Sequence, residues 1–381
     1  MKIAYIHSTP VPDKTPSTIQ IVQMADALAQ AGSQVHLYSL PGKVDIKDII
    51  GRDFHPNLTL IPIEKTLSNS VPLRSSLLFN LRVLIHLYKF KPDIIYLRRP
   101  SLAKTLLKFK IKSAKYIFET HEVFHQTSHE AGKSKTITDK NKNLEDYVYT
   151  KINGIVSITE GLKDDIFNTF PNCCKNIITS PDGVDLTLVN QVKDSYSDNN
   201  KVPHLLYIGS LHKWKGVQTL LEAMPYTSSG HLHIAGGKQS EIETLKLVAQ
   251  RLGISSRVTF IGYIAPKNRF QIIAKSDICL LPLSSMSIAS KYTSPLKLFE
   301  YMAMGKPIIS ADLPSIREVI THKQNGFLVE PESPVKLGDA INQLISDKAL
   351  QKSLGENALK DSESYTWINR ANTLQKWFKS I

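Results

Sequence analysis

Short apolar segments alternate along the chain with longer segments whose apolar residues recur at helical spacing. Residues 2–7 form an apolar run, and a loop with three prolines follows. Ser17 can cap a helix that runs to about Gln30, with apolar positions at helical spacing. Gly32 is expected to end that helix, and residues 35–38 have the apolar and aromatic character of the next strand. A strand, a loop, a helix and a strand in this order predict a right-handed βαβ unit of a parallel sheet.

The same alternation continues through the chain and begins afresh near residue 204. The first loop lacks the GxGxxG pattern, which argues against a dinucleotide fingerprint. The predicted fold class is α/β, with two doubly wound Rossmann-like domains that face each other across a cleft. Further strands are predicted at 93–97, 115–118, 154–158 and 177–179 in the first half, and at 204–208, 231–235, 258–261, 277–282, 307–309 and 326–329 in the second.

A chain of 381 residues is long enough for two domains. We expect an N-terminal acceptor-side domain over 1–190, a polar and charged linker over 191–201, and a C-terminal nucleotide-binding domain over 202–362. Residues 363–381 are predicted to form a last helix that packs back on the N-terminal domain.

One stretch, residues 294–309, combines a loop, a helix that carries one carboxylate, a glycine turn and a buried strand. A helix N-terminus presents free N–H groups and the positive end of a dipole, which suit a phosphate or a sugar hydroxyl. Glu300 could accept hydrogen bonds from a polyol such as ribose. The alternative is a surface glutamate on an ordinary crossover helix.

Two further segments place polar residues at the carboxyl ends of predicted strands. Gly209 would let the backbone approach a ligand, and Lys215 would offer a cation at the start of a helix. His121 follows the strand at 115–118 and lies between two glutamates, at the edge of the sheet where chemistry usually occurs.

Residues His121, Glu122 and His125 also match the zinc motif H-E-x-x-H. On one helix the two histidines would share a face and could bind zinc, with Glu122 as the general base. That interpretation requires a helix, whereas here the motif directly follows a predicted strand. Residues 125–142 are polar and lysine-rich, and a loop is predicted there.

Basic residues exceed acidic ones, 47 against 34, which gives a formal net charge of +13 and favours anionic partners. Within the basic segment 89–115, Lys104, Lys108 and Lys112 share a helix face that could lie on an anionic bilayer or simply be solvated. Three cysteines without a CxxC pattern fit a reducing compartment, and no 18-residue uncharged apolar run is present. We expect a cytoplasmic protein, peripheral at the inner face of the membrane.

The motifs taken together resemble the group 1 retaining glycosyltransferases of the GT-B fold, glycosyltransferase family 4. The resemblance covers nearly the whole chain, and the order and spacing of the motifs make it specific. It rests on 209–211 with Lys215 and Gly216, 258–262, Asp277 with Leu281 and Pro282, 294–307 and 326–329, and on 180–185 at the end of the first domain.

The resemblance implies a nucleotide-sugar donor held without a metal, and no Asp-x-Asp motif is present. Lys215 would bind the diphosphate, Glu300 the ribose, and His121 the donor sugar close to the reacting carbon. These three are the implied catalytic residues. The other implied donor contacts are Ser17 and Thr18 to the β-phosphate; Gly209 and Ser210; Gly262, Tyr263 and Ile264 to the base; and Ser294, Pro295, Leu296 and Lys297 to phosphate and sugar.

Two positions depart from the family pattern. Tyr292 stands where the family often has a second glutamate, which leaves the grip on the far hydroxyls of the sugar open. Ser210 stands where the family often has an arginine. Lys215 and Lys297 would then carry more of the diphosphate charge, although Lys297 could equally be a structural cation.

The predicted reaction is transfer of a hexosyl group from a nucleoside-diphosphate sugar to an acceptor hydroxyl, with retention. The expected acceptor is a carbohydrate, such as a polysaccharide, or a lipid-linked molecule, and no nucleic acid is expected as a partner. The alternatives are a GT-B sugar-nucleotide epimerase, the zinc hydrolase, and a nucleotide-sugar binder without activity.

Overall fold

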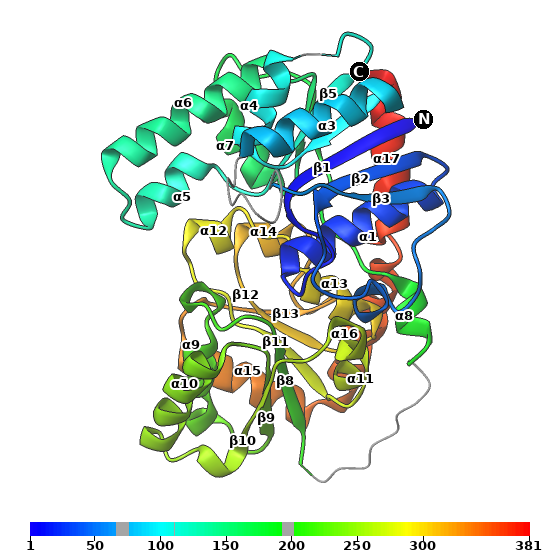
Figure 1. Ribbon diagram of the computed structural model, residues 1–381. Coiled ribbons are helices and arrows are strands. Elements are labelled where there is room, and N and C mark those ends of the chain that lie inside the picture. The colour runs from blue at the N-terminus through cyan, green and yellow to red at the C-terminus, as the bar shows by residue number, and fades with distance from the viewer. Residues whose placement is uncertain (66–75, 110, 193–201) are drawn as a thin grey trace. The chain divides into compact units, whose positions relative to one another are not determined.

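The computed structural model describes residues 1–65, 76–109, 111–192 and 202–381. The chain divides into two units, Met1–Pro181 with Trp367–Ile381 and Asp182–Thr366. Each unit is built on one sheet whose assigned strand pairs are all parallel (Figure 1). The predicted α/β class with two doubly wound domains is therefore confirmed.

The sheet of the first unit has seven strands in the order β3-β2-β1-β4-β5-β6-β7. The chain order reverses between β1 and β4, so the loops that leave these strands diverge there, and ligands usually bind at such a point. The central strands are buried on both faces and therefore read as continuous apolar runs. The strands are β1 Lys2–Pro10, β2 Gln34–Leu40, β3 Leu58–Pro62, β4 Ile94–Leu97, β5 Lys115–Thr120, β6 Gly154–Ser157 and β7 Ile177–Thr179.

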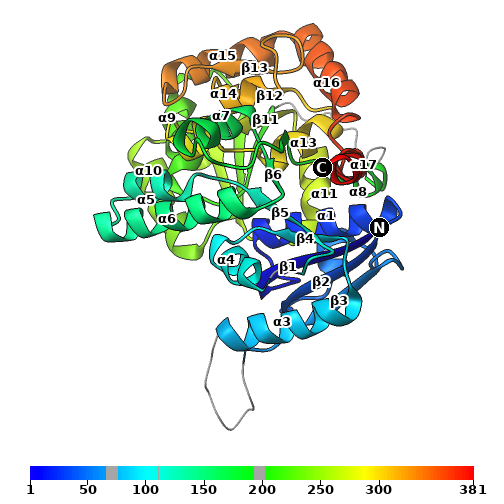
Figure 2. The same cartoon turned by 90° about the horizontal axis from the view of Figure 1, so that it is seen from above.

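Helices cover both faces of this sheet. Helices α1 (Pro16–Gln30) and α17 (Trp367–Ser380) lie on one face, and α3 (Ser76–Phe90) lies on the other (Figure 2). The remaining helices of the unit are α2 Lys47–Ile50, α4 Pro100–Lys108, α5 Phe124–Glu130, α6 Lys135–Lys151 and α7 Glu160–Thr169.

The C-terminal helix α17 is an integral part of the first unit. Its Phe378 is buried and packs edge-on against Tyr96 of β4, with 5.8 Å between ring centroids. Gln375 donates to the carbonyl of Leu28 at 3.0 Å and to the hydroxyl of Ser33 at 2.7 Å. These contacts fix α17 against the end of α1, so residues from the last part of the sequence reach the core of the first unit.

The sheet of the second unit has six strands in the order β10-β9-β8-β11-β12-β13, with the reversal between β8 and β11. One hydrophobic core lies on each face. The strands are β8 His204–Ile208, β9 His231–Ala235, β10 Val258–Gly262, β11 Ile278–Leu281, β12 Ile308–Ala311 and β13 Phe327–Val329. The helices are α8 Leu186–Asn190, α9 Val217–Ala223, α10 Gln239–Arg251, α11 Arg269–Ala274, α12 Ser287–Ser290, α13 Leu296–Ala303, α14 Pro314–Arg317, α15 Pro334–Ser346 and α16 Lys348–Ser362, with 3₁₀ turns at Lys213–Lys215, Met224–Tyr226, Ser255–Arg257 and Pro266–Asn268.

The chain changes unit earlier than the predicted linker at 191–201. Val184 already forms a bridge with Thr366, and Leu188 and Val189 belong to a core of the second unit. Residues 193–201 lie outside the described part of the chain. The change back to the first unit comes at Trp367, where α17 begins.

The loop predicted at 125–142 is wrong, because these residues belong to α5 and α6. The two helices are held together by Glu145 of α6, a buried carboxylate. It accepts hydrogen bonds from the backbone N–H of Phe124 at 2.6 Å and of His125 at 3.0 Å, which are at the start of α5. The helices were missed because α5 has no buried residue and the buried residues of α6 all follow residue 142, so no apolar pattern marks 125–142.

Within the described residues, no helix combines the length and apolar character that crossing a bilayer requires. The apolar side of the basic helix α4 is buried in the first unit through Leu102, Leu106 and Leu107. Helix α4 ends at Lys108, so the prediction that Lys112 shares a helix face with Lys104 and Lys108 is wrong. Lys104 and Lys108 lie on the side of α4 that is not buried, as expected of a surface crossover helix.

Candidate active site

In the second unit, the loops after β8 and β11 lie on either side of the point where the strand order reverses. Gly209 follows β8 with a φ of +148°, and a Cβ there would collide with Nζ of Lys297. A Cβ on Gly216 would collide with the carbonyl oxygen of Pro282, directly after β11. The glycines therefore permit a close approach of backbone and lysine that the sequence indicated only for Gly209.

Lys297 is buried, and its Nζ has no hydrogen-bond partner within the described part of the chain. Its side chain comes from the first turn of α13 and is 9% exposed, and Nζ lies 4.0 Å from the centroid of the Tyr207 ring. No acceptor for Nζ is found among the described residues. Burial, and then the neighbouring charge of Lys215, hold the pKa of Lys297 well below its ordinary value.

Lys215 is the second cation of this region. It ends the 3₁₀ turn after β8, and its Nζ lies 3.6 Å from the centroid of the Trp214 ring. Burial lowers the pKa of Lys215 to about 7. Because the charge of one lysine depresses the pKa of the other, an anion bound beside both would restore their full charge.

The start of α13 lies in the same region. The N-cap residue is Pro295, and no side chain caps the helix. The N–H groups of the first turn of a helix have no partner within it, so they are free to meet an anion. The hydroxyl of Ser294 has a structural contact, since it accepts a hydrogen bond from the backbone N–H of Asp182 at 2.8 Å.

Glu300, the expected ribose ligand, is buried and paired. Its Oε1 accepts a hydrogen bond from Nε of Arg269 at 2.6 Å, and Nη1 of Arg269 donates to the carbonyl of Pro266 at 2.6 Å. Arg269 was missed in the sequence, where no motif singles it out, because its contact with Glu300 arises only in the folded unit. The arginine fixes one carboxylate oxygen and so orients the other.

The residues expected at the base and at the far hydroxyls of the sugar lie in different environments. Gly262 ends β10 with a φ of +79°, and its carbonyl accepts a hydrogen bond from the N–H of Gly236 at 2.6 Å. Tyr263 is 53% exposed, whereas Ile264 packs against a hydrophobic core. Tyr292, which replaces the second glutamate, is buried. Ser210 follows Gly209 and accepts from the Tyr207 hydroxyl through its backbone carbonyl at 2.7 Å.

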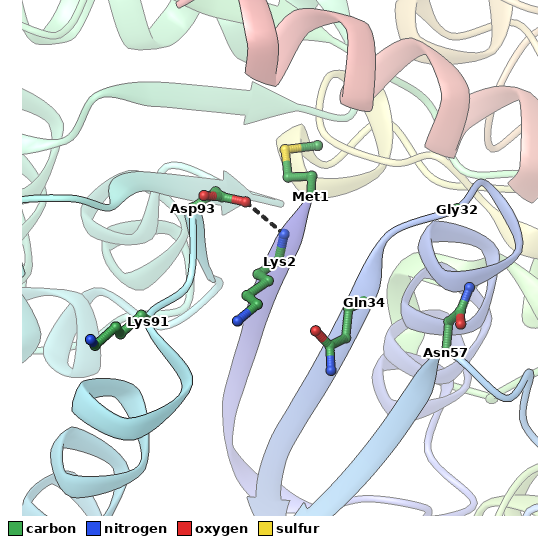
Figure 3. Close-up of a pocket in the computed structure, with 7 residues that line it drawn as sticks. All are labelled: Met1, Lys2, Gly32, Gln34, Asn57, Lys91 and Asp93. Carbon is green, nitrogen blue, oxygen red and sulfur yellow. Dashed lines mark hydrogen bonds between the residues drawn. The ribbon is translucent and has the colours of Figure 1, made fainter.

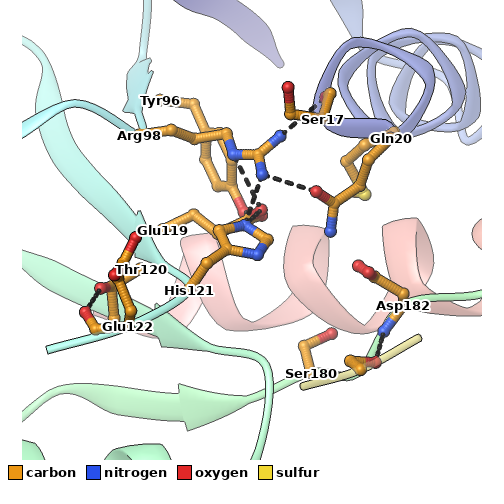
Figure 4. Close-up of polar contacts among 12 residues, drawn as sticks. Ser17, Gln20, Tyr96, Arg98, Glu119, Thr120, His121, Glu122, Ser180 and Asp182 are labelled. Atoms are coloured by element: carbon orange, nitrogen blue, oxygen red, sulfur yellow. Dashed lines mark hydrogen bonds and ion pairs between the residues drawn. The ribbon is translucent and has the colours of Figure 1, made fainter. Parts of the chain in front are cut away.

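In the first unit, a buried polar cluster lies at the carboxyl ends of β4 and β5 (Figure 4). Nε2 of His121 lies 2.7 Å from Oε1 of Glu119 and 2.6 Å from Nη2 of Arg98. Nη2 of Arg98 also donates to the side-chain oxygen of Gln20 at 2.5 Å. The cluster therefore joins α1, β4 and β5 around the predicted catalytic histidine.

The charges of this cluster shift the pKa values of its members. Burial alone would raise the pKa of Glu119, but the guanidinium groups of Arg370 and Arg98 hold it well below its ordinary value. Burial, and then Arg98, lower the pKa of His121 to about 4. A neutral imidazole therefore stands beside an ionised carboxylate at neutral pH. Sequence reasoning named the histidine but assigned no role to Arg98, Glu119 or Arg370.

Ser17 and Thr18, expected at the β-phosphate, differ in exposure. Thr18 is buried, and its hydroxyl donates to the carbonyl of Asp13 at 2.7 Å, so its side chain serves the loop. Ser17 is exposed in the first turn of α1, and its carbonyl accepts from Nη1 of Arg98 at 3.4 Å. The N-cap of α1 is Thr15 rather than Ser17.

The zinc motif does not lie on one helix. Helix α5 begins at Phe124, after His121 and Glu122. Nδ1 of His125 lies 2.9 Å from Oε2 of Glu145, away from the cluster that holds His121. Across the described residues, no group of three or more His, Cys, Asp or Glu side chains is placed to hold a metal ion. The condition that the zinc interpretation required is therefore not met.

An open hollow of about 530 Å³ lies at the opposite edge of the first sheet (Figure 3). It is formed where β1, β2 and β4 begin, and the backbone N–H of Lys2 donates to Asp93 at 2.7 Å there. None of the predicted site residues lines it. Its lining residues are Met1, Lys2, Gly32, Gln34, Asn57, Lys91 and Asp93.

The two parallel sheets, each with polar residues at the carboxyl ends of its strands, have the architecture of the GT-B fold that the motifs resemble. Comparison with family models gives the same class for each part of the chain. Residues 18–188 match glycosyltransferase family 4, and residues 190–361 match the glycosyl transferases group 1. The chain belongs to the group 1, family 4 glycosyltransferases, and it is a transferase enzyme. Both predictions are confirmed.

Relatives and solved structures agree with this assignment. An uncharacterized glycosyltransferase of Methanocaldococcus jannaschii is 25% identical over 79% of this chain and 78% of its own length. Other curated relatives are matched over less than two thirds of their length. Sucrose-phosphate synthase from Thermosynechococcus elongatus superposes with a TM-score of 0.82 at 18% identity, over 100% of this chain and 98% of that one. Anabaena HepE in complex with UDP-glucose gives 0.75 at 16% identity, over 100% of both chains.

Proposed function

We propose that this enzyme transfers a hexosyl group from a nucleoside-diphosphate sugar to an acceptor hydroxyl, with retention at the anomeric carbon. The observation that supports the donor is the buried Nζ of Lys297 beside Lys215, for which the described residues provide no hydrogen-bond acceptor. A buried charge without a partner costs several kcal/mol, about 3–5 when one member of a buried pair is removed. A diphosphate bound there would supply the missing negative charge.

The other predicted donor contacts fit the same ligand. The uncapped first turn of α13 offers N–H groups to phosphate, and Glu300, oriented by Arg269, offers its second carboxylate oxygen to ribose hydroxyls. The solved complex of HepE with UDP-glucose shows that this fold accommodates such a donor in another protein. Retention rests on the resemblance of the motifs to the family.

Departure of a nucleoside diphosphate develops negative charge, so stabilising that charge is the main catalytic task. Lys215, Lys297 and the helix N-terminus would do this with fixed positive charge, in the role that a metal plays elsewhere. His121 of the first unit is proposed to contact the donor sugar close to the reacting carbon.

A thermal-shift panel of UDP, GDP, ADP and their sugars tests donor binding. One base should raise the unfolding midpoint, because a ligand that binds only the native state stabilises it by RT ln(1 + [L]/Kd). Lys215→Met should abolish the shift. Lys213→Met, an exposed lysine on the same 3₁₀ turn, should retain it. No shift with any nucleotide would contradict the proposal.

Turnover of the donor so identified separates transfer from its rivals. The wild type should release the nucleoside diphosphate, and His121→Ala and Glu300→Ala should not. This result would exclude a nucleotide-sugar binder without activity. NMR of the sugar nucleotide incubated without acceptor would show a new epimer only if the enzyme is an epimerase. NMR of the glycosylated product reports whether the anomeric configuration is retained.

The acceptor is proposed to be a carbohydrate or a lipid-linked molecule, with the first unit at an anionic membrane surface. The basic side of α4 supports this, and so does the exposed row Leu81, Ile85 and Tyr88 on α3. Liposome flotation with anionic lipid should show weaker binding when Lys104, Lys108 and Lys112 are neutralised together. Equal flotation of the wild type and this variant would remove the membrane from the proposal.

A further inference from the structure

Glu119 of β5 lies fully buried between the catalytic histidine and an arginine from the far end of the sequence. Its Oε2 accepts a hydrogen bond from the hydroxyl of Tyr96 and another from Nη2 of Arg370 at 3.1 Å. Its Oε1 faces Nε2 of His121 at 2.7 Å. The carboxylate thus has one oxygen committed to the protein interior and one directed at the imidazole.

Nε2 of His121 cannot satisfy both of its neighbours. An ionised carboxylate only accepts hydrogen bonds and a guanidinium only donates them, so Glu119 requires a proton on Nε2 and Arg98 requires a lone pair. The two arrangements are the two tautomers of the neutral ring.

The surroundings favour the proton on Nε2. Nη2 of Arg98 keeps an acceptor, the side-chain oxygen of Gln20 at 2.5 Å, when it does not donate to the imidazole. Oε1 of Glu119 has as its other close contact Nε of Arg98 at 3.3 Å, a weaker interaction than the 2.7 Å contact with His121. The hydrogen bond that His121 donates to Glu119 is therefore the strongest interaction available to Oε1.

We propose that Glu119, held by Arg370 of the C-terminal helix, is a positioning residue that keeps His121 as the Nε2–H tautomer. Nδ1 is then an unprotonated acceptor, which suits a hydroxyl of the donor sugar. Figure 4 shows the second ring nitrogen directed away from Arg98 and Glu119, and His121 is 25% exposed. The part of this inference that concerns the sugar rests on the proposed function.

Arg370 connects Glu119, the residue that sets the tautomer of His121, to helix α17. Its Nε donates to the carbonyl of Ser180 at 3.2 Å, and its Nη1 lies 2.9 Å from the sulfur of Met24 in α1. These contacts leave the guanidinium little freedom, so Oε2 of Glu119 is fixed and Oε1 is directed at Nε2 of His121, with Nε of Arg98 as its longer contact at 3.3 Å. The last helix of the chain therefore acts on the chemistry through one carboxylate.

Nitrogen-15 NMR of full-length protein labelled in histidine measures the tautomer directly, and the His121 signals are identified by their loss in His121→Gln. The wild type should show the Nε2–H pattern. In Glu119→Gln the amide must keep its oxygen toward Arg370 and so turns its NH₂ toward Nε2, which should shift the ring to the Nδ1–H pattern. Glu122→Gln, a neighbouring carboxylate outside the cluster, should leave the tautomer unchanged.

In the same variants, Glu119→Gln should lower kcat by about 10²-fold, as expected when a group that contacts the substrate loses its productive geometry, with a smaller change in KM for the donor. Arg370→Lys should retain the wild-type tautomer.

A wild-type spectrum of the Nδ1–H form would overturn the proposal, and so would an unchanged tautomer in a folded Glu119→Gln variant of low kcat. If that variant does not fold, the wild-type spectrum alone decides. Failure of every nucleotide sugar to bind would refute the proposed function instead, because the tautomer is measured without ligand.

Discussion

The two polar clusters of this enzyme differ in whether their buried charged groups have partners within the protein. In the first unit, the buried carboxylate of Glu119 is surrounded by partners from β4, α17 and the segment after β5. In the second unit, the buried ammonium group of Lys297 has an aromatic face beside it and no hydrogen-bond acceptor among the described residues. The first cluster pairs its charge with groups of the protein, whereas in the second the described residues offer Nζ of Lys297 no acceptor.

The difference separates two tasks that a transferase must perform. A complete network holds a catalytic side chain in one orientation before the substrate arrives, which avoids reorganisation during the reaction. An incomplete network makes the free protein less stable, and binding of the ligand restores that stability. The following predictions test this contrast, from the largest expected effect to the smallest.

Glu119→Ala should destabilise the protein by about 3–5 kcal/mol, because two buried arginines lose their carboxylate. Chemical denaturation of the free protein measures the loss. Glu160→Ala, an exposed carboxylate paired with Lys163, provides the control, with a change below about 1 kcal/mol. A loss as small for Glu119 as for Glu160 would show that the first cluster does not depend on its carboxylate.

Lys297→Met should raise the stability of the free protein and lower its affinity for the nucleotide. The free protein should be more stable by about 1 kcal/mol or more, since an unpaired buried charge is removed with little change in volume. Affinity for UDP, or for the nucleoside diphosphate that the panel selects, should fall by about 10- to 100-fold, as expected for loss of a charged hydrogen bond.

Lys306 provides the matched control for Lys297. It is partly buried in the second unit, and its Nζ donates to the carbonyls of Ala274 and Ser276, each at 2.7 Å. Lys306→Met should therefore destabilise the protein and leave nucleotide affinity unchanged. If Lys297→Met behaved in the same way, Lys297 would be a structural cation.

Acid should weaken the first unit at a pH where carboxylates are still ionised. In the folded protein, mainly because of burial, the pKa of His121 is about 4 and that of His7 is about 3. In the unfolded chain the pKa of a histidine is about 6.5. Between these values the unfolded state binds more protons, so stability falls as the pH drops from 6.5 to 4. Urea midpoints across this range measure it, and His121→Gln should flatten the slope. An equal slope in that variant would contradict the assignment.

Ser210→Arg should partly restore nucleotide affinity to Lys297→Met. The family often has an arginine at this position, and the new guanidinium would return a positive charge to the loop after β8. A recovery of a few fold, roughly 1 kcal/mol, is the smallest effect expected here. Calorimetric titration of the single and double variants measures it, and Ser210→Lys tests whether charge alone is sufficient. No recovery in either would mean that the two positions do not serve the same ligand.

The sequence predicted the fold because buried parallel strands appear as continuous apolar runs and their crossover helices as periodic ones. It failed at α5 and the first part of α6, which bury no residue up to position 142 and therefore carry no apolar pattern. In the site, His121, Lys215 and Glu300 were found from their places in motifs, but Arg269 and Arg370 were not. The position of an arginine relative to a distant carboxylate is set by tertiary packing, which leaves no local pattern. That the described residues offer Lys297 no hydrogen-bond acceptor is likewise visible only in the folded unit.

The central claim is that Lys215 and Lys297 bind the diphosphate of the donor. Calorimetric titration of UDP and UMP at pH 8, in two buffers of different ionisation enthalpy, tests this claim most directly. The pKa of Lys215 is about 7 in the free protein, and a bound diphosphate should raise it, so binding should take up protons. We predict that UDP binds with proton uptake, that UMP binds much more weakly, and that Lys297→Met reduces both affinity and uptake. Binding of UDP and UMP with equal affinity and no proton uptake would contradict the account.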